Sequence, residues 1–409
     1  MTKLEKMLKY VSEHNEFYKN RIKEYGIKDP LDITQWPVLT RKELQENRYN
    51  MFSDGYIEEY YKGNMIRKTS SGSSGIPVNV YWPRNELYAS NLSLWRRRMK
   101  WYGIKPSDRY VVFSLNAYNH TLKSQSACLY TIKDSILLIN ITSVRDEEDY
   151  QKIAHIINEF NPVWLYVQPS ILSELIYIYQ KYFIPRPPNL RYIESIGELL
   201  TAETKRSASW FFGVEVANMY GSEEMNGIAY ECPHHSMNIL DDNVYLEIEN
   251  NTGIHPYGTG ETIITSLHSY GMPLIRYKQG DMISIDDAKN CLCSDLGKQI
   301  SIIYGRVHNS IQINDKTILN SFFLMELISE VNNQFNDIIL QYRFVYEEKN
   351  RKLTCYVVFD HTRTNWKQST IGVIAELFYS KVAGTIIKFE VKEEIRRIAH
   401  EKKTILEKI

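Results

Sequence analysis

Between residues 110 and 218 the sequence alternates short apolar runs with longer stretches of helical periodicity. The apolar runs predict buried strands, and the stretches between them predict helices of about three turns or more. Strands that alternate with such helices usually pair in parallel, with the helices packed on the sheet. We therefore predict an α/β fold with a largely parallel sheet here. The predicted strands are 110–113, 135–139, 163–167, 190–193 and 214–218, and the clearest helices are 147–160 and 171–183.

After residue 240 the pattern shifts toward alternating strands, as at 244–248 and 262–266. Past Gly305 and Arg306 it restarts as a small α+β unit, with helices at about 321–333 and 366–382. A chain of 409 residues is also too long for one typical core. We predict a large N-terminal domain at 1–305, with mixed sheets and flanking helices, and a small α+β C-terminal domain at 306–409.

Charge and apolar content narrow the functional classes. Lys+Arg and Asp+Glu both number 49, so the net charge is near zero, which disfavours binding to nucleic acid or an anionic membrane. No apolar run approaches the ~20 residues that span a bilayer, and the charged N-terminus lacks a signal-peptide core. Five cysteines argue against a disulfide framework. We expect a cytoplasmic protein. We interpret the basic cluster at 96–100 as a solvated helix face, and an anion-binding site is the alternative interpretation.

Residues 69–77, Thr-Ser-Ser-Gly-Ser-Ser-Gly-Ile-Pro, form the most distinctive short stretch. Its hydroxyl side chains, glycines and proline disfavour a helix or a packed strand. A loop of this kind can surround an anion with N–H and O–H donors. A flexible linker is the alternative. However, apolar residues follow directly at Val78 and Val80, so the loop opens an ordered strand.

Residues 218–224, Asn-Met-Tyr-Gly-Ser-Glu-Glu, directly follow a predicted buried strand. Ligands of open α/β sheets bind beyond the carboxyl ends of strands. Tyr220 can stack on a purine, Gly221 permits close approach, and a carboxylate can hold Mg²⁺. A turn with solvated acidic side chains is the alternative interpretation.

Two further motifs supply polar groups for a nucleotide. Asp281, after Gly280, can accept two hydrogen bonds from a ribose diol, and Arg276 could contact phosphate or pair with an acid. Arg306 could be a second ribose or phosphate ligand. In the tail His-Glu-Lys-Lys at 400–403, an ammonium group could reach a developing negative charge.

In this order the motifs resemble the adenylate-forming ligase (ANL) superfamily, most closely its phenylacetate–CoA ligase branch with its capsule-biosynthesis (CapK-type) and coenzyme F390 synthetase relatives. Segments 190–198 and 228–233 match that branch as well. The resemblance implies ATP-dependent activation of a small carboxylic acid, for which an aryl acid is compatible. The acyl-adenylate would then pass to CoA or to a carrier-protein thiol. The alternatives are transfer to an amine, giving an amide in polysaccharide or secondary-metabolite biosynthesis, and a non-catalytic nucleotide-binding member. A homodimer is also implied.

The resemblance assigns roles residue by residue. Glu224 would lie near Mg²⁺, Asp281 would hold the ribose with support from Arg306, and Lys402 would be the catalytic lysine, with Lys403 as a rival. The β- and γ-phosphates of ATP would be held by Thr69, Ser70, Ser71, Gly72, Ser73, Ser74 and Gly75. The adenine pocket would be lined by Gly197, Glu198, Tyr220 and Gly221, with Ser222 beside it. One departure stands out, because Glu223 replaces the family's usual threonine and adds negative charge unless it points away.

Several members of this branch bind a structural zinc ion, and the cysteines here fall at matching places. The histidine of that pattern is replaced by Asn238, so His234 or His235 could substitute. Unligated buried thiols are the alternative. The predicted closed Cys₃His site consists of Cys232, His235, Cys291 and Cys293.

Overall fold

The computed structural model describes residues 1–70, 78–114, 128–287, 293, 297–307, 310–314, 317–335, 338–359, 368–382, 385–392, 395 and 406–409. Within these ranges no helix is both long and apolar enough to cross a membrane. The helices are α1 (Lys3–His14), α2 (Glu16–Tyr25), α3 (Arg41–Asn47), α4 (Tyr56–Tyr61), α5 (Arg84–Tyr102), α6 (Glu147–Phe160), α7 (Pro169–Lys181), α8 (Ala202–Phe212), α9 (Ser321–Phe335) and α10 (Gln368–Lys381), with short 3₁₀ turns at Ile33–Gln35 and Ile141–Ser143.

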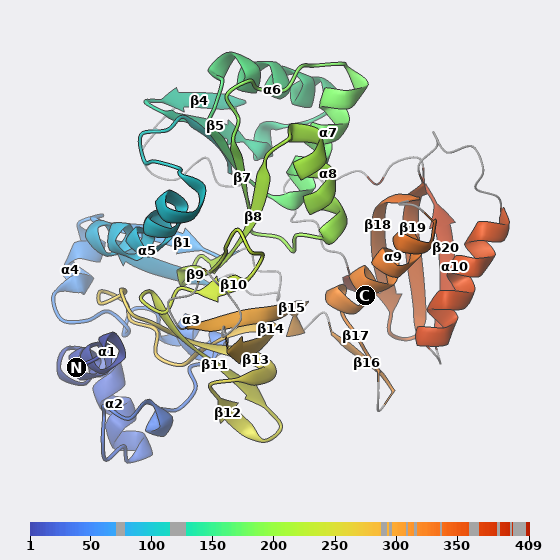
Figure 1. Cartoon of the computed structure of the whole chain (residues 1–409). Coiled ribbons are helices and arrows are strands. Elements are labelled where there is room, and N and C mark those ends of the chain that lie inside the picture. Colours follow the sequence, from blue (N-terminus) through green and yellow to red (C-terminus); the bar gives the residue numbers. More distant parts are fainter. Residues whose placement is uncertain are drawn as a thin grey trace.

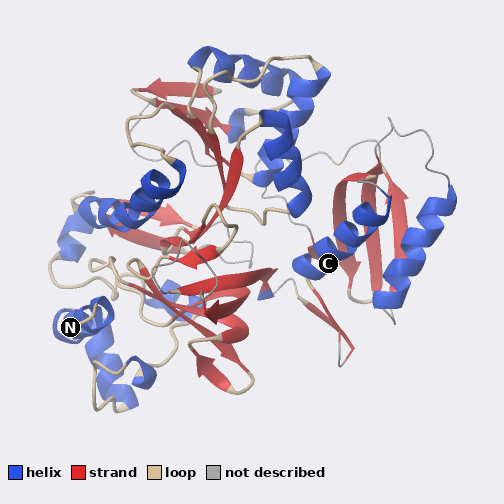
Figure 2. Ribbon diagram, in the orientation of Figure 1, coloured by secondary structure: helices blue, strands red, loops and turns tan. Residues whose placement is uncertain are grey.

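One large mixed sheet organises the chain up to Arg306 (Figures 1 and 2). Its strand order is β12-β11-β13-β14-β15-β10-β9-β8-β7-β6-β3-β5-β4. The bounds are β3 (Tyr110–Ser114), β4 (Tyr130–Lys133), β5 (Ile136–Asn140), β6 (Trp164–Val167), β7 (Tyr192–Ile196), β8 (Glu215–Ser222), β9 (Asn226–Glu231), β10 (Met237–Ile239), β11 (Val244–Asn250), β12 (Gly253–His255), β13 (Gly258–Ser266), β14 (Tyr277–Asp287) and β15 (Lys298–Arg306).

The predicted parallel sheet is confirmed between β5 and β8, where the pairs β5–β3, β3–β6, β6–β7 and β7–β8 are all parallel. Apolar side chains cover both faces, because helices pack on each. Residues of α6, α7 and α8 join one buried cluster with Val111, Leu165 and Ile193. The other face meets α5 through a cluster that contains Leu94 and Trp164.

Capping residues at both ends explain why α6 begins and ends at the predicted residues. Asp146 caps its N-terminus by accepting from the Asp149 backbone N–H at 3.0 Å, and the first turn is acidic, which suits the helix dipole. Asn161 ends the helix in the left-handed conformation, with φ of 50°. The apolar stripe between these signals, at Ile153 and Ile157, faces the sheet.

The antiparallel half of the sheet carries the N-terminal segment, in which α1 packs through Met7, Leu8 and Val11 and α2 packs through Tyr18. Beside it lies the hairpin of β1 (Met65–Thr69) and β2 (Asn79–Pro83), which flanks the Ser/Gly loop. The strands on either side of residues 71–77 therefore pair with each other, which agrees with the expectation that an ordered strand follows the loop.

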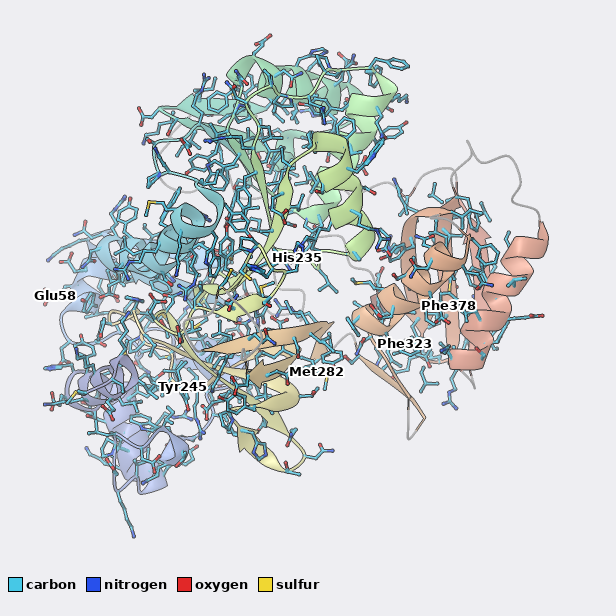
Figure 3. All side chains as sticks on the ribbon, viewed as in Figure 1. Glu58, His235, Tyr245, Met282, Phe323 and Phe378 are labelled. Carbon is cyan, nitrogen blue, oxygen red and sulfur yellow. The ribbon has the colours of Figure 1, made fainter. Side chains whose placement is uncertain are left out.

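The C-terminal segment forms a second sheet, of order β20-β19-β18-β21, with α9 and α10 packed on it (Figure 1). Phe323 and Phe378, labelled in Figure 3, belong to its separate core. This arrangement confirms the predicted fold class. The bounds are β18 (Ile339–Glu347), β19 (Lys352–Phe359), β20 (Ile386–Val391) and β21 (Leu406–Lys408), and the segment β16 (Ile311–Asn314) pairs with β17 (Thr317–Leu319).

Candidate functional site

Tyr220, Asp281 and Arg306 meet from three strands of the large sheet. The Tyr220 hydroxyl donates to Asp281 Oδ2 at 2.7 Å, and Arg306 Nε lies 3.0 Å from Asp281 Oδ1. Asp281 and Arg306 are register partners of β14 and β15, which explains why residues 25 positions apart touch. The sequence motifs on β8, β14 and β15 thus converge on one carboxylate.

Gln279 is a member of this cluster that sequence reasoning missed. Its Nε2 donates to Asp281 Oδ2 at 2.7 Å and to the Tyr220 hydroxyl at 3.1 Å. Its Oε1 is buried, and no group in the described part of the chain donates to it. The available signal was strand alternation, since Gln279 and Asp281 are two residues apart on β14 and share a face. A ribose hydroxyl would satisfy the Oε1 acceptor.

Burial keeps the Tyr220 phenol in its protonated form. Desolvation, and then the charge of Asp281, raise the pKa of Tyr220 well above its ordinary value. The hydroxyl therefore remains a donor to Asp281 over the physiological range, and the ring stays fixed beside the cluster.

Glu224 lies in a separate buried setting. Its side chain is 4% exposed, it accepts from the Tyr277 hydroxyl at 3.2 Å, and Arg41 Nη1 lies 3.7 Å from its Oε1. A carboxylate oxygen is the ligand type that Mg²⁺ takes, so the donor fits the predicted ion.

The neighbouring Glu223 turns to a different cation. Its carboxylate lies 3.1 Å from Lys68 Nζ, at the end of β1, and both side chains are partly exposed. The extra negative charge noted in the sequence is therefore paired with Lys68.

Gly221 and Ser222 shape the turn that presents these acids. A Cβ atom on Gly221 would lie 2.3 Å from the Asn226 carbonyl oxygen, so the close approach of β8 and β9 itself requires glycine. Ser222 Oγ accepts from the Met225 backbone N–H at 3.2 Å. Both residues thus have a demonstrated structural role in the hairpin.

Gly197 and Glu198 follow β7, next to β8. The Glu198 carboxylate accepts from the backbone N–H and hydroxyl of Ser170, each at 3.0 Å, and so caps the start of α7. Gly197 has a φ of 74°, in the left-handed region that favours glycine. The predicted adenine-binding role of this pair stays a prediction beside these local roles.

Only the start of the predicted phosphate loop is described. Thr69 Oγ1 donates to Asn79 Oδ1 at 2.7 Å, and Ser70 Oγ accepts from the Val78 backbone N–H at 2.9 Å, so the hydroxyls tie the two ends of the loop together. The remaining predicted residues Ser71, Gly72, Ser73, Ser74, Gly75, Cys291, Lys402 and Lys403 lie outside the described residues.

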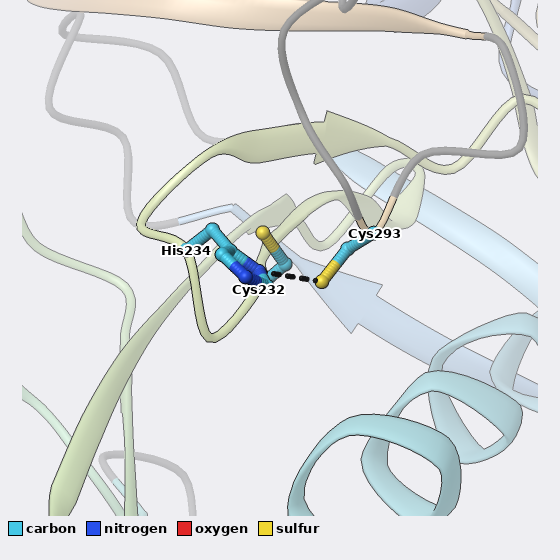
Figure 4. Close-up of side chains that lie close together, drawn as sticks. All are labelled: Cys232, His234 and Cys293. Atoms are coloured by element: carbon cyan, nitrogen blue, oxygen red, sulfur yellow. Dashed lines mark hydrogen bonds between the residues drawn. The ribbon is translucent and has the colours of Figure 1, made fainter.

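Cys232, His234 and Cys293 come together at the turn after β9 (Figure 4). Their ligand atoms all lie within 4.8 Å of one another, and His234 Nδ1 is 3.0 Å from Cys293 Sγ. Two thiols and an imidazole at this spacing fit the soft tetrahedral ligand set of zinc. Of the two histidines considered from the sequence, His234 is the one beside the thiols, whereas the ring of His235, with backbone φ of 60°, contacts Lys205 and Glu231.

His235 borders a polar cleft of about 440 Å³ at the start of α8. Lys205 forms an ion pair with Glu231 and lies 3.2 Å from His235 Nδ1. Glu231 also accepts from the Asn218 backbone N–H at 2.8 Å, two residues before Tyr220. The cleft therefore adjoins the strand that carries Tyr220.

No protein-family model matches the chain. In sequence it is 26% identical over 298 residues to a phenylacetate–coenzyme A ligase of Pseudomonas putida, covering 67% of this chain and 63% of that protein. It is 23% identical over 328 residues to the enzyme of the same name from Thermus thermophilus, covering 76% of this chain and 70% of that protein. The chain therefore matches less than two thirds of the length of the first relative.

Solved structures show the same fold. A 2-hydroxyisobutyryl-CoA ligase in the postadenylation state, in complex with 2-HIB-AMP, superimposes with a TM-score of 0.76 at 17% identity, over 99% of this chain and 88% of that one. The amide bond synthetase McbA from Marinactinospora thermotolerans gives 0.54 at 13% identity, over 83% of this chain and 66% of that one. The chain therefore shares the fold of this 2-hydroxyisobutyryl-CoA ligase, and its sequence is similar to phenylacetate–coenzyme A ligases.

Proposed function

We propose that this protein activates a carboxylic acid with ATP and transfers the acyl group to a thiol, of CoA or a carrier protein. In the first half-reaction a carboxylate oxygen attacks the α-phosphorus, the bond to the β-phosphate breaks, and acyl-adenylate and pyrophosphate form. The observation that carries the proposal is the convergence of Tyr220, Gln279 and Arg306 on Asp281.

The described residues have defined tasks in this reaction. Asp281 and the Gln279 Oε1 acceptor would hold the ribose hydroxyls, and Tyr220 would lie against the adenine. Glu224 would hold Mg²⁺, which supplies positive charge to the phosphate oxygens as the P–O bond breaks. Catalysis in such a site is mainly positioning and electrostatic stabilisation.

The names of the similar proteins support this reaction class. The sequence relatives are coenzyme A ligases, and the ligase with the shared fold was solved with an acyl-AMP. We further propose a cytoplasmic protein divided at residues 305 and 306, where β15 ends, with a mobile C-terminal domain that carries Lys402.

Acid-dependent pyrophosphate–ATP exchange tests the proposal directly. The purified full chain, screened with aryl and aliphatic acids and Mg²⁺, is expected to exchange label only with its own acid class. Exchange needs the first half-reaction alone, so the acceptor does not have to be known. The proposal is wrong if no acid in a broad panel supports exchange or pyrophosphate release.

A second candidate function keeps adenylation and uses an amine as acceptor. It is favoured by the shared fold with the amide bond synthetase. Incubation of the enzyme with ATP and the active acid, with CoA in one arm and amines in the other, separates the two when products are identified by mass spectrometry.

We also propose that Cys232, His234 and Cys293, with Cys291, hold a structural zinc ion. The purified chain is expected to contain about one zinc per chain by elemental analysis, because a closed Cys₃His set binds zinc tightly. His234→Ala should lower the zinc content and the melting temperature, whereas the matched control His235→Ala should retain the metal. Equal zinc content in the two variants, or zinc-free wild type after metal-supplemented expression, would contradict the assignment.

A further inference from the structure

Glu231, at the end of β9, holds the β8 backbone just before Tyr220. The pairing of β8 with β9 begins at Met219, and its register shifts directly after Tyr220. The Asn218 N–H lies outside this pairing and donates instead to the Glu231 carboxylate, at 2.8 Å to Oε2. A hydrogen bond to a charged group is stronger than one between neutral groups. The Glu231 carboxylate therefore secures β8 next to the point where its pairing with β9 becomes irregular.

The other oxygen of this carboxylate is held by Lys205 from α8. Lys205 forms an ion pair with Glu231 Oε1, and the two side chains are 22% and 9% exposed. The cap of α8 determines the position of Lys205, because the Lys205 N–H donates to the Thr201 carbonyl and Thr201 Oγ1 accepts from the Thr204 N–H, each at 3.0 Å. An ion pair that is largely removed from water is screened less than a surface pair.

This ion pair joins the two segments that we propose to enclose the base of the nucleotide. On one side, α8 follows the turn at residues 197–198, which ends β7. On the other side, Glu231 holds Asn218, which lies two residues before Tyr220 on β8 and so shares its face. Lys205, Asn218 and Glu231 all line the polar cleft of about 440 Å³. A change in the pair would therefore alter the spacing between the two segments.

We propose that Lys205 and Glu231 are positioning residues for the base of the bound nucleotide, and that their ion pair fixes the spacing between Tyr220 and the turn at residues 197–198. This inference rests on the proposed function, in which Tyr220 lies against adenine. The effect requires no contact of either side chain with the phosphates or the acid. It therefore applies to every ligand that carries the base, to ATP and AMP alike, and not to pyrophosphate.

Variants of the full chain test the inference in the exchange assay. Lys205→Met and Glu231→Gln should each raise the KM for Mg·ATP and the inhibition constant of AMP by roughly 10-fold, because charge-assisted hydrogen bonds are lost. The KM for pyrophosphate and the maximal exchange rate should stay within about twofold of wild type. Lys205→Arg keeps the charge and should recover most of the affinity. The matched control Glu215→Gln changes a carboxylate that is 42% exposed and 4.0 Å from His235 Nδ1, and should behave as wild type.

Direct binding separates positioning from a general loss of stability. The double variant Lys205→Met with Glu231→Gln leaves no buried charge unpaired, and the glutamine can still accept from the Asn218 N–H, but the link from α8 is lost. Calorimetry should show roughly 10-fold weaker AMP binding, with a melting temperature close to that of wild type. Wild-type AMP affinity in these variants, or an equal loss in the KM for pyrophosphate and in the exchange rate, would overturn the inference.

The proposed function can fail without deciding the role of the pair. If wild type shows no exchange with any acid, that function is wrong, and calorimetric AMP binding to the same variants still tests Lys205 and Glu231. Failure of wild type to bind AMP at all would overturn the positioning role as well.

Discussion

Replacing Glu224 with glutamine is expected to lower acid-dependent pyrophosphate–ATP exchange by roughly 100- to 1,000-fold, because a metal ion supplies several kcal/mol of transition-state stabilisation. Glutamine keeps the shape and still accepts from the Tyr277 hydroxyl, so the fold should be retained. The amide oxygen is a weaker ligand for Mg²⁺ than a carboxylate. The loss should fall mainly on kcat and should be partly offset by higher Mg²⁺ concentration.

The adjacent carboxylate offers a matched control. Glu223→Gln removes the same charge one residue away, but Glu223 pairs with Lys68 and is 41% exposed. Because an exposed ion pair contributes at most ~1 kcal/mol, exchange should change by no more than about fivefold. If Glu223→Gln proved as damaging as Glu224→Gln, the assignment of the metal to Glu224 would be wrong.

Local signals in the sequence were sufficient for most elements of the fold. The capping residues at Asp146 and Asn161 and the stripe between them define α6 without reference to the rest of the chain. The capping box at Thr40 and Glu43 was likewise readable from residue types alone. Such elements are predictable because their ends are determined within a few residues.

The site was predictable only where a motif lies on one strand. Tyr220 and Asp281 were each identified from their own segment, yet their contact could not be foreseen, because β15, β10 and β9 lie between β14 and β8 in the sheet order. Gln279 was missed because its role comes from strand alternation inside a motif that was interpreted through Asp281. The pair of Lys205 and Glu231 was missed because its members, on α8 and β9, lie 26 residues apart in the sequence.

Partners that are distant in the sequence also limited the interpretation of the basic cluster at 96–100. A solvated helix face was expected, and Arg96, with a side chain 73% exposed, agrees with it. Arg98 does not, because it is buried and makes two hydrogen bonds to Glu194 of β7, at 2.8 and 2.5 Å. Helical periodicity alone cannot separate these cases, since Glu194 is 96 residues away.

The Arg98–Glu194 pair leads to the largest expected change in stability. Both side chains are almost fully buried, at 6% and 0% exposure, and Trp95 and Trp164 pack on the guanidinium. Burial alone would lower the pKa of Arg98, but the charge and hydrogen bonds of Glu194 raise it above its ordinary value. Glu194→Ala would leave a guanidinium that cannot lose its charge in an aromatic setting. We expect a loss of about 3–5 kcal/mol in the free energy of unfolding, measured by urea denaturation with tryptophan fluorescence.

Two further variants test whether the loss comes from the buried, unpaired charge and not from the removal of a glutamate as such. Glu148→Ala breaks an exposed pair with Lys152, where Glu148 is 72% exposed, and should cost about 0.5 kcal/mol or less. The double variant Arg98→Leu with Glu194→Leu removes both charges and should be more stable than Glu194→Ala alone, because no buried charge remains. If instead the double variant were less stable than Glu194→Ala, the hydrogen bonds and ring contacts of Arg98 would outweigh the cost of burying its charge. The pair would then stabilise the α5 face of the sheet in its own right.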